Sequence, residues 1–255
     1  MILSATDARQ CGETRCRALC SYNGTDEYED DFAMAYEAVR RYQIRPWMQA
    51  FSVSQALGAE AWRAAEAAQI DCFPWRQSGR KQATEVRLLY EPEALHLLFV
   101  AEDAHSFALA RELNGKVCKD SCVEFFANPW PDEGSAYFNC EVNCCGALHL
   151  GFRSPDGDTR YVTRDQAARI GIRSSLPGPA KDESPDDAEW RLYLCLPCSV
   201  LSDLCGREVA FAGRWRGNFY RCGGRTEPQH ACWNPIGAPR PSFHRPAEFG
   251  ELQFV

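Results

Sequence analysis

A series of short apolar segments separated by turn residues is the feature that most restricts the fold of this chain. It begins with TEVRLLY at Thr84 and LHLLFVAED at Leu95, which flank the turn-like EPEA. Segments of this length, bounded by turn signals and without helical spacing, are typical of β-strands. The other predicted strands are CVEFFANP (122–129), AYFNCEVNC (136–144), ALHLGF (147–152), WRLYLCLP (190–197), EVAFAGRW (208–215) and ELQFV (251–255).

These strands do not alternate with long amphipathic helices, which argues against a parallel β-α-β sheet. The pattern predicts an all-β fold, an antiparallel two-sheet β-sandwich of jelly-roll type. The Ala-rich segment 55–68 predicts a short helix beside it. A long connection at 225–250 has little strand pattern, and loops of this length in a compact domain are usually functional or disordered. Its aromatic residues favour an ordered, functional loop.

Residues 1–33 lack hydrophobic periodicity and end in the acidic cluster TDEYEDD. Such segments bury too little apolar surface to fold alone, so we expect a disordered or loosely attached tail. The predicted domain spans 34–255, and Met34 is an alternative start of the natural protein. The beginning of the chain shows neither a basic segment nor a long apolar one, so it predicts no secretion signal. This favours the cytoplasm, whereas a wrongly assigned N-terminus would allow an extracellular or periplasmic protein.

Charge and cysteine content limit the partners. A formal net charge of −7 argues against nucleic acid and anionic membranes as partners, because binding to them requires clustered Lys and Arg.

The 14 cysteines are a smaller fraction of the chain than in disulfide-built scaffolds. We expect most of them to be buried free thiols, with disulfides as the alternative. Cys195 and Cys198 form CLPC, but no second pair at zinc-finger spacing supports a metal site.

The segment YFNCEVN carries the first group of candidate binding residues. Strand alternation places Tyr137, Asn139, Glu141 and Asn143 on one face, opposite Phe138, Cys140 and Val142. Amides and carboxylates can bond several hydroxyl groups, so this row suits a polyhydroxylated ligand. The alternative is the solvated face of an ordinary antiparallel strand.

Two further carboxylates, Asp120 and Glu124, lie in KDSCVEFF. Glu124 lies in an otherwise apolar strand and therefore needs a polar partner or water. Glu124 and Glu141 could act as acid and base in glycoside hydrolysis if their carboxylates lie about 5–10 Å apart. The sequence leaves open whether the two residues meet.

Aromatic residues gather near the end of the chain, in GNFYRCGG (217–224) and HACWNPIG (230–237). Small-ligand pockets combine apolar walls with a few convergent polar groups, and the C–H faces of sugars pack on aromatic rings. We interpret GNFYRCGG as a strand-to-loop exit in which Phe219 anchors the core while Asn218 and Arg221 face a ligand.

Taken in order, DSCVEFF, YFNCEVNCCGALH, WRLYLCLP, RGNFYRCGG, CWNPI and PSFHRPAEFGELQF resemble the carbohydrate-binding module family 9-like proteins. The match runs from about Tyr42 to Val255. The resemblance implies a non-catalytic β-sandwich, often attached to xylanases and related hydrolases, that binds saccharides between aromatic side chains. The resemblance also allows a structural calcium ion, which is the one cofactor that we consider for this chain.

Our first hypothesis is therefore a module that binds oligosaccharides or polysaccharides, of the xylan or cellulose type, in carbohydrate catabolism. Trp233 is the predicted stacking platform, with Tyr137 or Trp215 as a second wall. The predicted polar ligand-binding residues are Asp120, Glu124, Glu141, Asn143, Asn218 and Arg221. The alternatives are a glycoside hydrolase-associated enzyme that uses Glu124 and Glu141, and a cofactor-binding sandwich such as a redox or haem protein.

Overall fold

The computed structural model describes residues 38–47, 53–176, 178, 180–184, 186 and 188–255. Residues Ala38–Val255 form one compact unit. The predicted tail, 1–33, and the alternative start at Met34 lie outside the described residues. No helix of the described part is long and apolar enough to cross a membrane.

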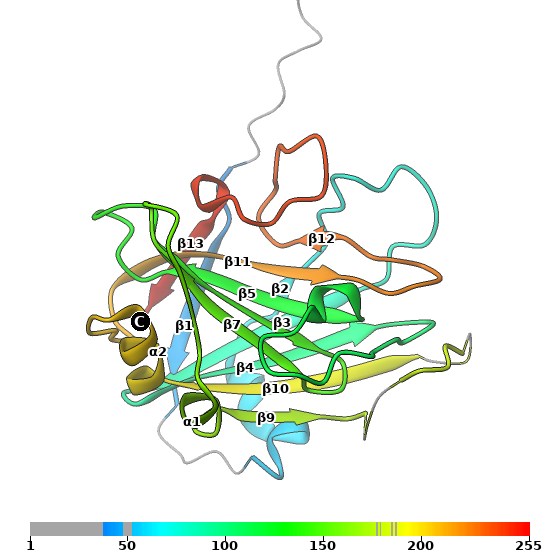
Figure 1. Ribbon diagram of the computed structural model, residues 1–255, viewed down its shortest axis with the longest axis horizontal. Helices are drawn as coiled ribbons and strands as arrows, with labels where there is room; N and C mark the ends of the chain where they lie inside the picture. Colours follow the sequence, from blue (N-terminus) through cyan, green and yellow to red (C-terminus); the bar gives the residue numbers. More distant parts are fainter. Residues whose placement is uncertain (1–37, 48–52, 177, 179, 185, 187) are drawn as a thin grey trace, which may run out of the picture. The chain divides into compact units, whose positions relative to one another are not determined.

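Strands dominate the unit (Figure 1). They are β1 (Arg41–Pro46), β2 (Ala68–Gln69), β3 (Thr84–Glu91), β4 (Ala94–Glu102), β5 (Cys122–Asn128), β6 (Tyr137–Asn143), β7 (Leu148–Arg153), β8 (Thr159–Tyr161), β9 (Gly171–Ser174), β10 (Glu189–Pro197), β11 (Arg214–Cys222), β12 (Ala231–Cys232) and β13 (Gly250–Phe254). The helices are α1 (Arg164–Ala167) and α2 (Cys198–Cys205), with 3-10 turns η1 (Ala56–Gly58), η2 (Glu60–Ala64), η3 (Val117–Lys119) and η4 (Pro246–Glu248).

The hydrogen-bonded order is β8-β7-β6-β5-β11-β13-β1-β3-β4-β10-β9, with β12 beside β11 and β2 beside β3. Residues 41–44 of β1 pair in parallel with β13, and its last two residues pair in parallel with β3. One strand therefore joins both halves of the structure. The predicted mostly β fold is confirmed, and the described strands form one curled, mixed sheet. The predicted purely antiparallel pairing is therefore wrong, whereas the two-sheet sandwich stays a prediction.

We call β8, β7, β6, β5, β11 and β13 the first half of the sheet, and β3, β4, β10 and β9 the second half. Alternating side chains from both halves meet in one buried cluster, which includes Phe125 and Phe138 from the first half and Val86, Phe99 and Leu192 from the second. The sheet curls because burying one apolar face of each half against the other removes both from water. The outer face of the first half is thereby left for other contacts.

Most predicted strands are confirmed to within a residue or two, but three local predictions are wrong. Of the predicted strand 208–215, only the last two residues are strand: β11 begins at Arg214, and Gly213 before it has a positive φ of 67°. GNFYRCGG is therefore mostly strand, and only Gly223 and Gly224 turn with positive φ. The predicted helix at 55–68 is two 3-10 turns, η1 and η2, while α2 after CLPC was not predicted.

Gly217 lies inside β11, where the chain passes close to its neighbours. A Cβ atom added there would lie 2.7 Å from Leu252 Cδ1 and 2.8 Å from the carbonyl oxygen of Phe126. Gly58 in η1 has open space at the same position. The requirement for glycine in β11 is thus steric.

Gly217→Ala is expected to lower the free energy of unfolding by about 1–3 kcal/mol, because the added methyl group overpacks the sheet. Gly58→Ala, the control, should change it by less than about 0.5 kcal/mol in either direction. Urea unfolding of both variants measures the difference. Equal stability of the two variants would show that β11 can shift to accept the methyl group.

Candidate functional site

The candidate site lies on the outer face of the first half, which strand alternation fills with polar and aromatic residues. The outward residues of β5 and β6 are Cys122, Glu124, Phe126, Asn128, Tyr137, Asn139, Glu141 and Asn143. Phe138, Cys140 and Val142 point instead into the shared core. The predicted division of YFNCEVN between two faces is therefore confirmed.

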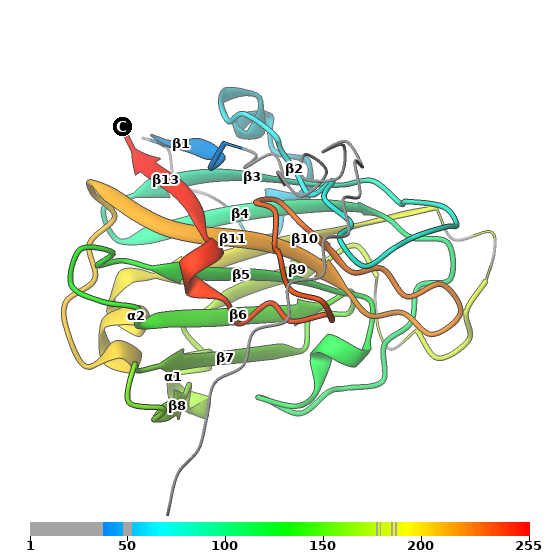
Figure 2. The same cartoon turned by 90° about the horizontal axis from the view of Figure 1, so that it is seen from above.

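The loop between β12 and β13 seals part of this face, and Figure 2 shows it lying across β11, β5 and β6. Phe243 from the loop stacks on Tyr220 with ring centroids 4.3 Å apart, and Phe249 meets Tyr137 edge-on at 5.5 Å. Tyr137 is buried as a result, and its hydroxyl bonds His244 Nδ1 at 2.9 Å. Tyr137, which was predicted as a second wall for the sugar, therefore belongs to a smaller apolar cluster.

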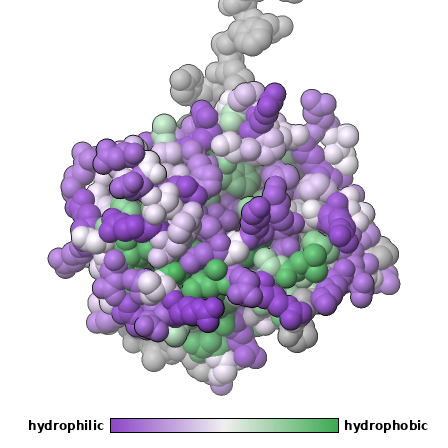
Figure 3. All heavy atoms as spheres, viewed as in Figure 1, coloured by the Kyte–Doolittle hydropathy of each residue, from purple (hydrophilic) through white to green (hydrophobic). Residues whose placement is uncertain are grey.

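The part of the face over β6, β7 and β8 carries an exposed ring. Tyr161 is 48% exposed, and no other Phe, Trp or Tyr is among the exposed large hydrophobic residues of the described part. Its ring lies over Gly151, where an added Cβ would come within 3.2 Å of Tyr161 Cδ1. His149 meets the ring edge-on at 5.3 Å. On the face shown in Figure 3, hydrophilic residues cover most of the surface, with smaller hydrophobic areas between them.

A row of hydrogen-bonded polar side chains lies beside Tyr161. Arg153 Nε donates to Asn139 Oδ1 at 3.2 Å, and Asn139 Nδ2 donates to Glu141 Oε1 at 2.8 Å. His149 lies opposite Glu141 in the β6–β7 register. We call Asn139, Glu141, His149, Arg153 and Tyr161 the outer strip.

The electrostatics of the outer strip centre on Glu141, which is only 6% exposed. Burial raises the pKa of Glu141, while His149, the Asn139 hydrogen bond and Arg153 partly oppose that rise. Burial thus disfavours the charged form of Glu141, and the nearby donors and positive charges favour it. Such a group can accept ligand hydroxyls, because its second oxygen is not needed by Asn139.

Glu124 and Glu141 lie directly opposite each other on β5 and β6. Glu124 is the more deeply buried, and Cys222 Sγ donates to its Oε1 at 2.9 Å. Burial, the Cys222 sulfur and the neighbouring Glu141 raise the pKa of Glu124 well above its usual range. The two carboxyl groups lie on the same face of the sheet, but Glu124 contacts the Cys222 sulfur, whereas Glu141 is part of the outer strip.

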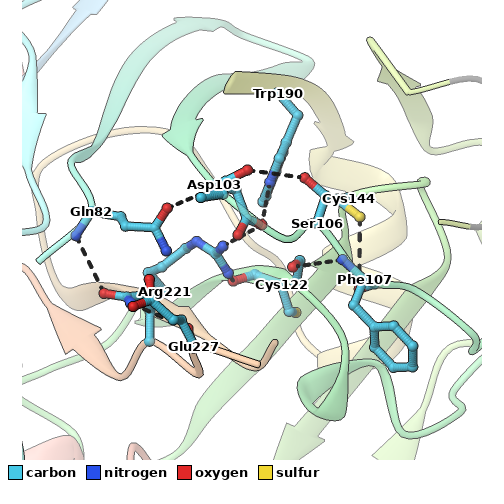
Figure 4. A network of polar contacts seen from close by, with 12 residues as sticks. Gln82, Asp103, Ser106, Phe107, Cys122, Cys144, Trp190, Arg221 and Glu227 are labelled. Atoms are coloured by element: carbon cyan, nitrogen blue, oxygen red, sulfur yellow. Dashed lines mark hydrogen bonds and ion pairs between the residues drawn. The ribbon is translucent and has the colours of Figure 1, made fainter. Parts of the chain in front are cut away.

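Arg221 points into the shared core instead of toward a ligand. Its Nη2 forms an ion pair with Asp103 Oδ2 at 2.6 Å, and Trp190 Nε1 donates to the same oxygen at 2.8 Å (Figure 4). Its Nη1 donates to the carbonyl of Cys222 at 2.6 Å. The predicted ligand contact of Arg221 is therefore replaced by a buried ion pair that joins the two halves.

Three other predicted polar residues brace loops. Asn218 donates to the carbonyl of Asn234 at 2.9 Å and accepts from the Asn234 amide at 2.8 Å. Asp120 accepts from the Leu109 and Ala110 amides at 3.0 and 2.9 Å, and from Asn143 Nδ2 at 2.8 Å. These side chains are buried and use their polar atoms on the protein itself.

The two predicted stacking tryptophans are core residues. Trp233, 4% exposed, packs on Tyr42 and Phe219, and Trp215, 1% exposed, packs on Phe138 and Phe254. This corrects the expectation that Trp233 stands open in the loop. Neither ring has the free face that stacking on a sugar requires, so the exposed Tyr161 takes that place in the candidate site.

A hollow lies on the outer face of the second half. It measures about 470 Å³ and is walled by residues that include Trp62, Arg87 and Arg191. The guanidinium groups there already pair with carboxylates, Arg87 with Glu85 at 3.1 Å and Arg191 with Glu189 at 2.8 Å. Trp62 is buried, and its Nε1 donates to the carbonyl of Ala56. The hollow lacks an exposed ring, so it is the weaker candidate.

A family model described as "Carbohydrate-binding family 9" matches residues 56–254. The chain belongs to carbohydrate-binding family 9. Comparison with curated proteins gave no match. Among solved structures, this family 9 chain is similar to a protein of Bacteroides uniformis with a provisional carbohydrate-binding assignment, at 26% identity and a TM-score of 0.76. That match covers 86% of this chain and 100% of the other.

Two structures of a family 9 module from Caldicellulosiruptor kristjanssonii share the fold at 12% identity. The complex with glucose has a TM-score of 0.55 and covers 85% of this chain and 96% of the module. The complex with cellotriose has a TM-score of 0.54 and covers 84% and 93%. At this identity the likeness concerns the fold alone.

Proposed function

We propose that this family 9 protein binds saccharides without cleaving them, at the outer strip, and that its ligands are β-linked glycans of the cellulose or xylan type. The observation that carries the proposal is the exposed Tyr161 ring beside the bonded row of Arg153, Asn139 and Glu141. The glucose and cellotriose complexes of the C. kristjanssonii module support this ligand class. We further propose a role in carbohydrate catabolism.

Each part of the outer strip has a function in this proposal. The C–H face of a sugar ring packs on Tyr161, which is already partly desolvated by His149 and Gly151. Hydroxyl groups at the ring edge donate to Glu141 and accept from Arg153 or His149. Hydroxyls exchange bonds with water for bonds with protein at little net gain, so we expect a Kd of about 1 μM to 1 mM.

Calorimetric titration of the full chain with glucose, cello-oligosaccharides and xylo-oligosaccharides tests the proposal. We expect saturable binding to at least one series, with no release of reducing ends during the experiment. Absence of binding to both series and to a broad glycan panel would overturn it.

The affinity is expected to depend on pH through Glu141. Because burial raises the pKa of Glu141, it becomes protonated at a higher pH than an ordinary carboxylate, and it then accepts fewer hydroxyl bonds. Affinity should therefore be full above that raised pKa and fall as the pH is lowered through it. Titrations from about pH 8 to about pH 4 measure this. The Glu141→Gln variant should bind saccharide more weakly, and its affinity should change less with pH. If the affinity of Glu141→Gln changes with pH as the wild-type affinity does, another group causes the pH dependence.

One observation favours a second candidate, glycoside hydrolysis: Glu124 and Glu141 lie opposite each other on neighbouring strands. Retaining hydrolysis places its two carboxyl groups about 5 Å apart. Turnover of chromogenic glycosides that disappears in Glu124→Gln would favour this function. Saccharide binding with no turnover across such substrates would leave the non-catalytic proposal in place.

A further inference from the structure

A buried cluster of two thiols and a carboxylate lies on the outer face of the first half, beside the outer strip. It consists of Cys122 and Glu124 on β5 and Cys222 on β11. Cys122 and Cys222 face each other in the strand register, and one ligand atom from each of the three residues lies within 4.8 Å of the others. All three side chains are buried.

This grouping is unusual for a protein interior, because nothing cationic balances the carboxylate. Within the described residues no ion pair includes Glu124, and its hydrogen bond comes from the Cys222 thiol. A buried carboxyl group without a cationic partner stays protonated and neutral, and it becomes a carboxylate when it coordinates a metal ion. Other buried carboxylates here have stronger partners: Asp103 has Arg221, and Asp120 has two backbone amides.

We propose that Cys122, Cys222 and Glu124 form a binding site for a thiophilic divalent cation, with Zn²⁺ as the best-fitting ion. Thiolate and carboxylate are both common zinc ligands, and thiolate is a poor ligand for calcium or magnesium. Zn–S bonds of about 2.3 Å separate two tetrahedral sulfur ligands by about 3.8 Å, so small side-chain adjustments suffice. Binding releases the thiol protons to solvent.

The 3-10 turn η3 lies next to the cluster. η3 passes over the cluster, and the Cys118 carbonyl lies 3.4 Å from Cys222 Sγ. The Cys118 side chain is exposed, so this turn forms the boundary between the cluster and solvent. A water molecule would complete four-fold coordination. The site differs from structural calcium, which takes oxygen ligands only.

The test measures metal retention in the full chain, kept reduced. Cys11, Cys16 and Cys20 lie outside the described residues and could bind zinc themselves. They are therefore replaced by serine in every protein tested, including the parent. After loading with Zn²⁺ and gel filtration with a weak chelator, elemental analysis should find one zinc ion per chain. Cys222→Ala should lower the zinc affinity at least tenfold, and Glu124→Gln should also weaken it while keeping the side-chain shape.

Cys232→Ala is the matched control, because Cys232 is also buried and faces another cysteine, Cys72, across an isolated bridge. It should retain zinc like the parent. Substitution with Co²⁺ gives a second readout, a thiolate-to-metal absorption that Cys222→Ala loses and Cys232→Ala keeps. No retained zinc in the parent, or equal retention in Cys222→Ala and the parent, would overturn the proposal. These readouts use no saccharide, so they are independent of the proposed binding function.

Discussion

Replacing Arg221 by methionine is expected to destabilise the protein by about 3–5 kcal/mol, because Asp103 is then left charged and buried without its partner. The Arg221–Asp103 contact of 2.6 Å lies inside the curled sheet, with the guanidinium carbon 5.3 Å from the centre of the Trp190 ring. Arg221 belongs to β11 and Asp103 follows β4, so the pair links the two halves. Chemical denaturation measures the loss.

An exposed ion pair provides the control for Arg221→Met. Arg245 contacts Glu248 at 2.7 Å in solvent, and Arg245→Met should cost less than about 1 kcal/mol. The double variant Asp103→Leu with Arg221→Met removes both charges and should be more stable than Arg221→Met alone. If all three variants lose the same stability, the buried pair does not join the halves as the contacts indicate.

The second large effect concerns saccharide affinity at the outer strip. Tyr161→Ala and Arg153→Ala are each expected to weaken binding about tenfold, which corresponds to about 1.4 kcal/mol. The first removes the stacking ring, and the second removes a donor that also orients Asn139. Both side chains are at least partly solvent-exposed, so the variants should fold normally. Titration with the tightest-binding oligosaccharide measures each Kd.

Arg191→Ala is the matched control for Arg153→Ala, because Arg191 lines the hollow on the second half of the sheet. It should leave the affinity unchanged. The opposite pattern, with affinity lost in Arg191→Ala and kept in Arg153→Ala, would move the binding site to that hollow.

Local periodicity predicted the strands and the two faces of β6, because alternation depends only on neighbours in the chain. The route from β1 to both β13 and β3 was not predictable, since parallel pairing brings together residues far apart in sequence, such as Arg41 and Glu251. The mixed sheet is therefore a property of long-range pairing, and no local pattern in RYQIRP encodes it.

The site was harder to predict than the fold for similar reasons. Arg221 looked like a ligand contact because its partner, Asp103, is 118 residues away. Trp233 follows a turn-rich segment, yet it packs across Gly250, where an added Cβ would lie 2.4 Å from its ring. Tyr161 was missed because β8 has only three residues, too few to show a period. Of the polar row predicted in YFNCEVN, Asn139 and Glu141 belong to the outer strip.

The location of saccharide binding is tested most directly by NMR spectroscopy of the labelled protein, titrated with cello- or xylo-oligosaccharide. We expect amide chemical-shift changes to concentrate in β6, β7 and β8 at Asn139, Glu141, His149, Arg153 and Tyr161, with β3, β4 and β10 unchanged. Shifts confined to β3, β4 and β10, or no shifts at saturating saccharide, would contradict the proposed site.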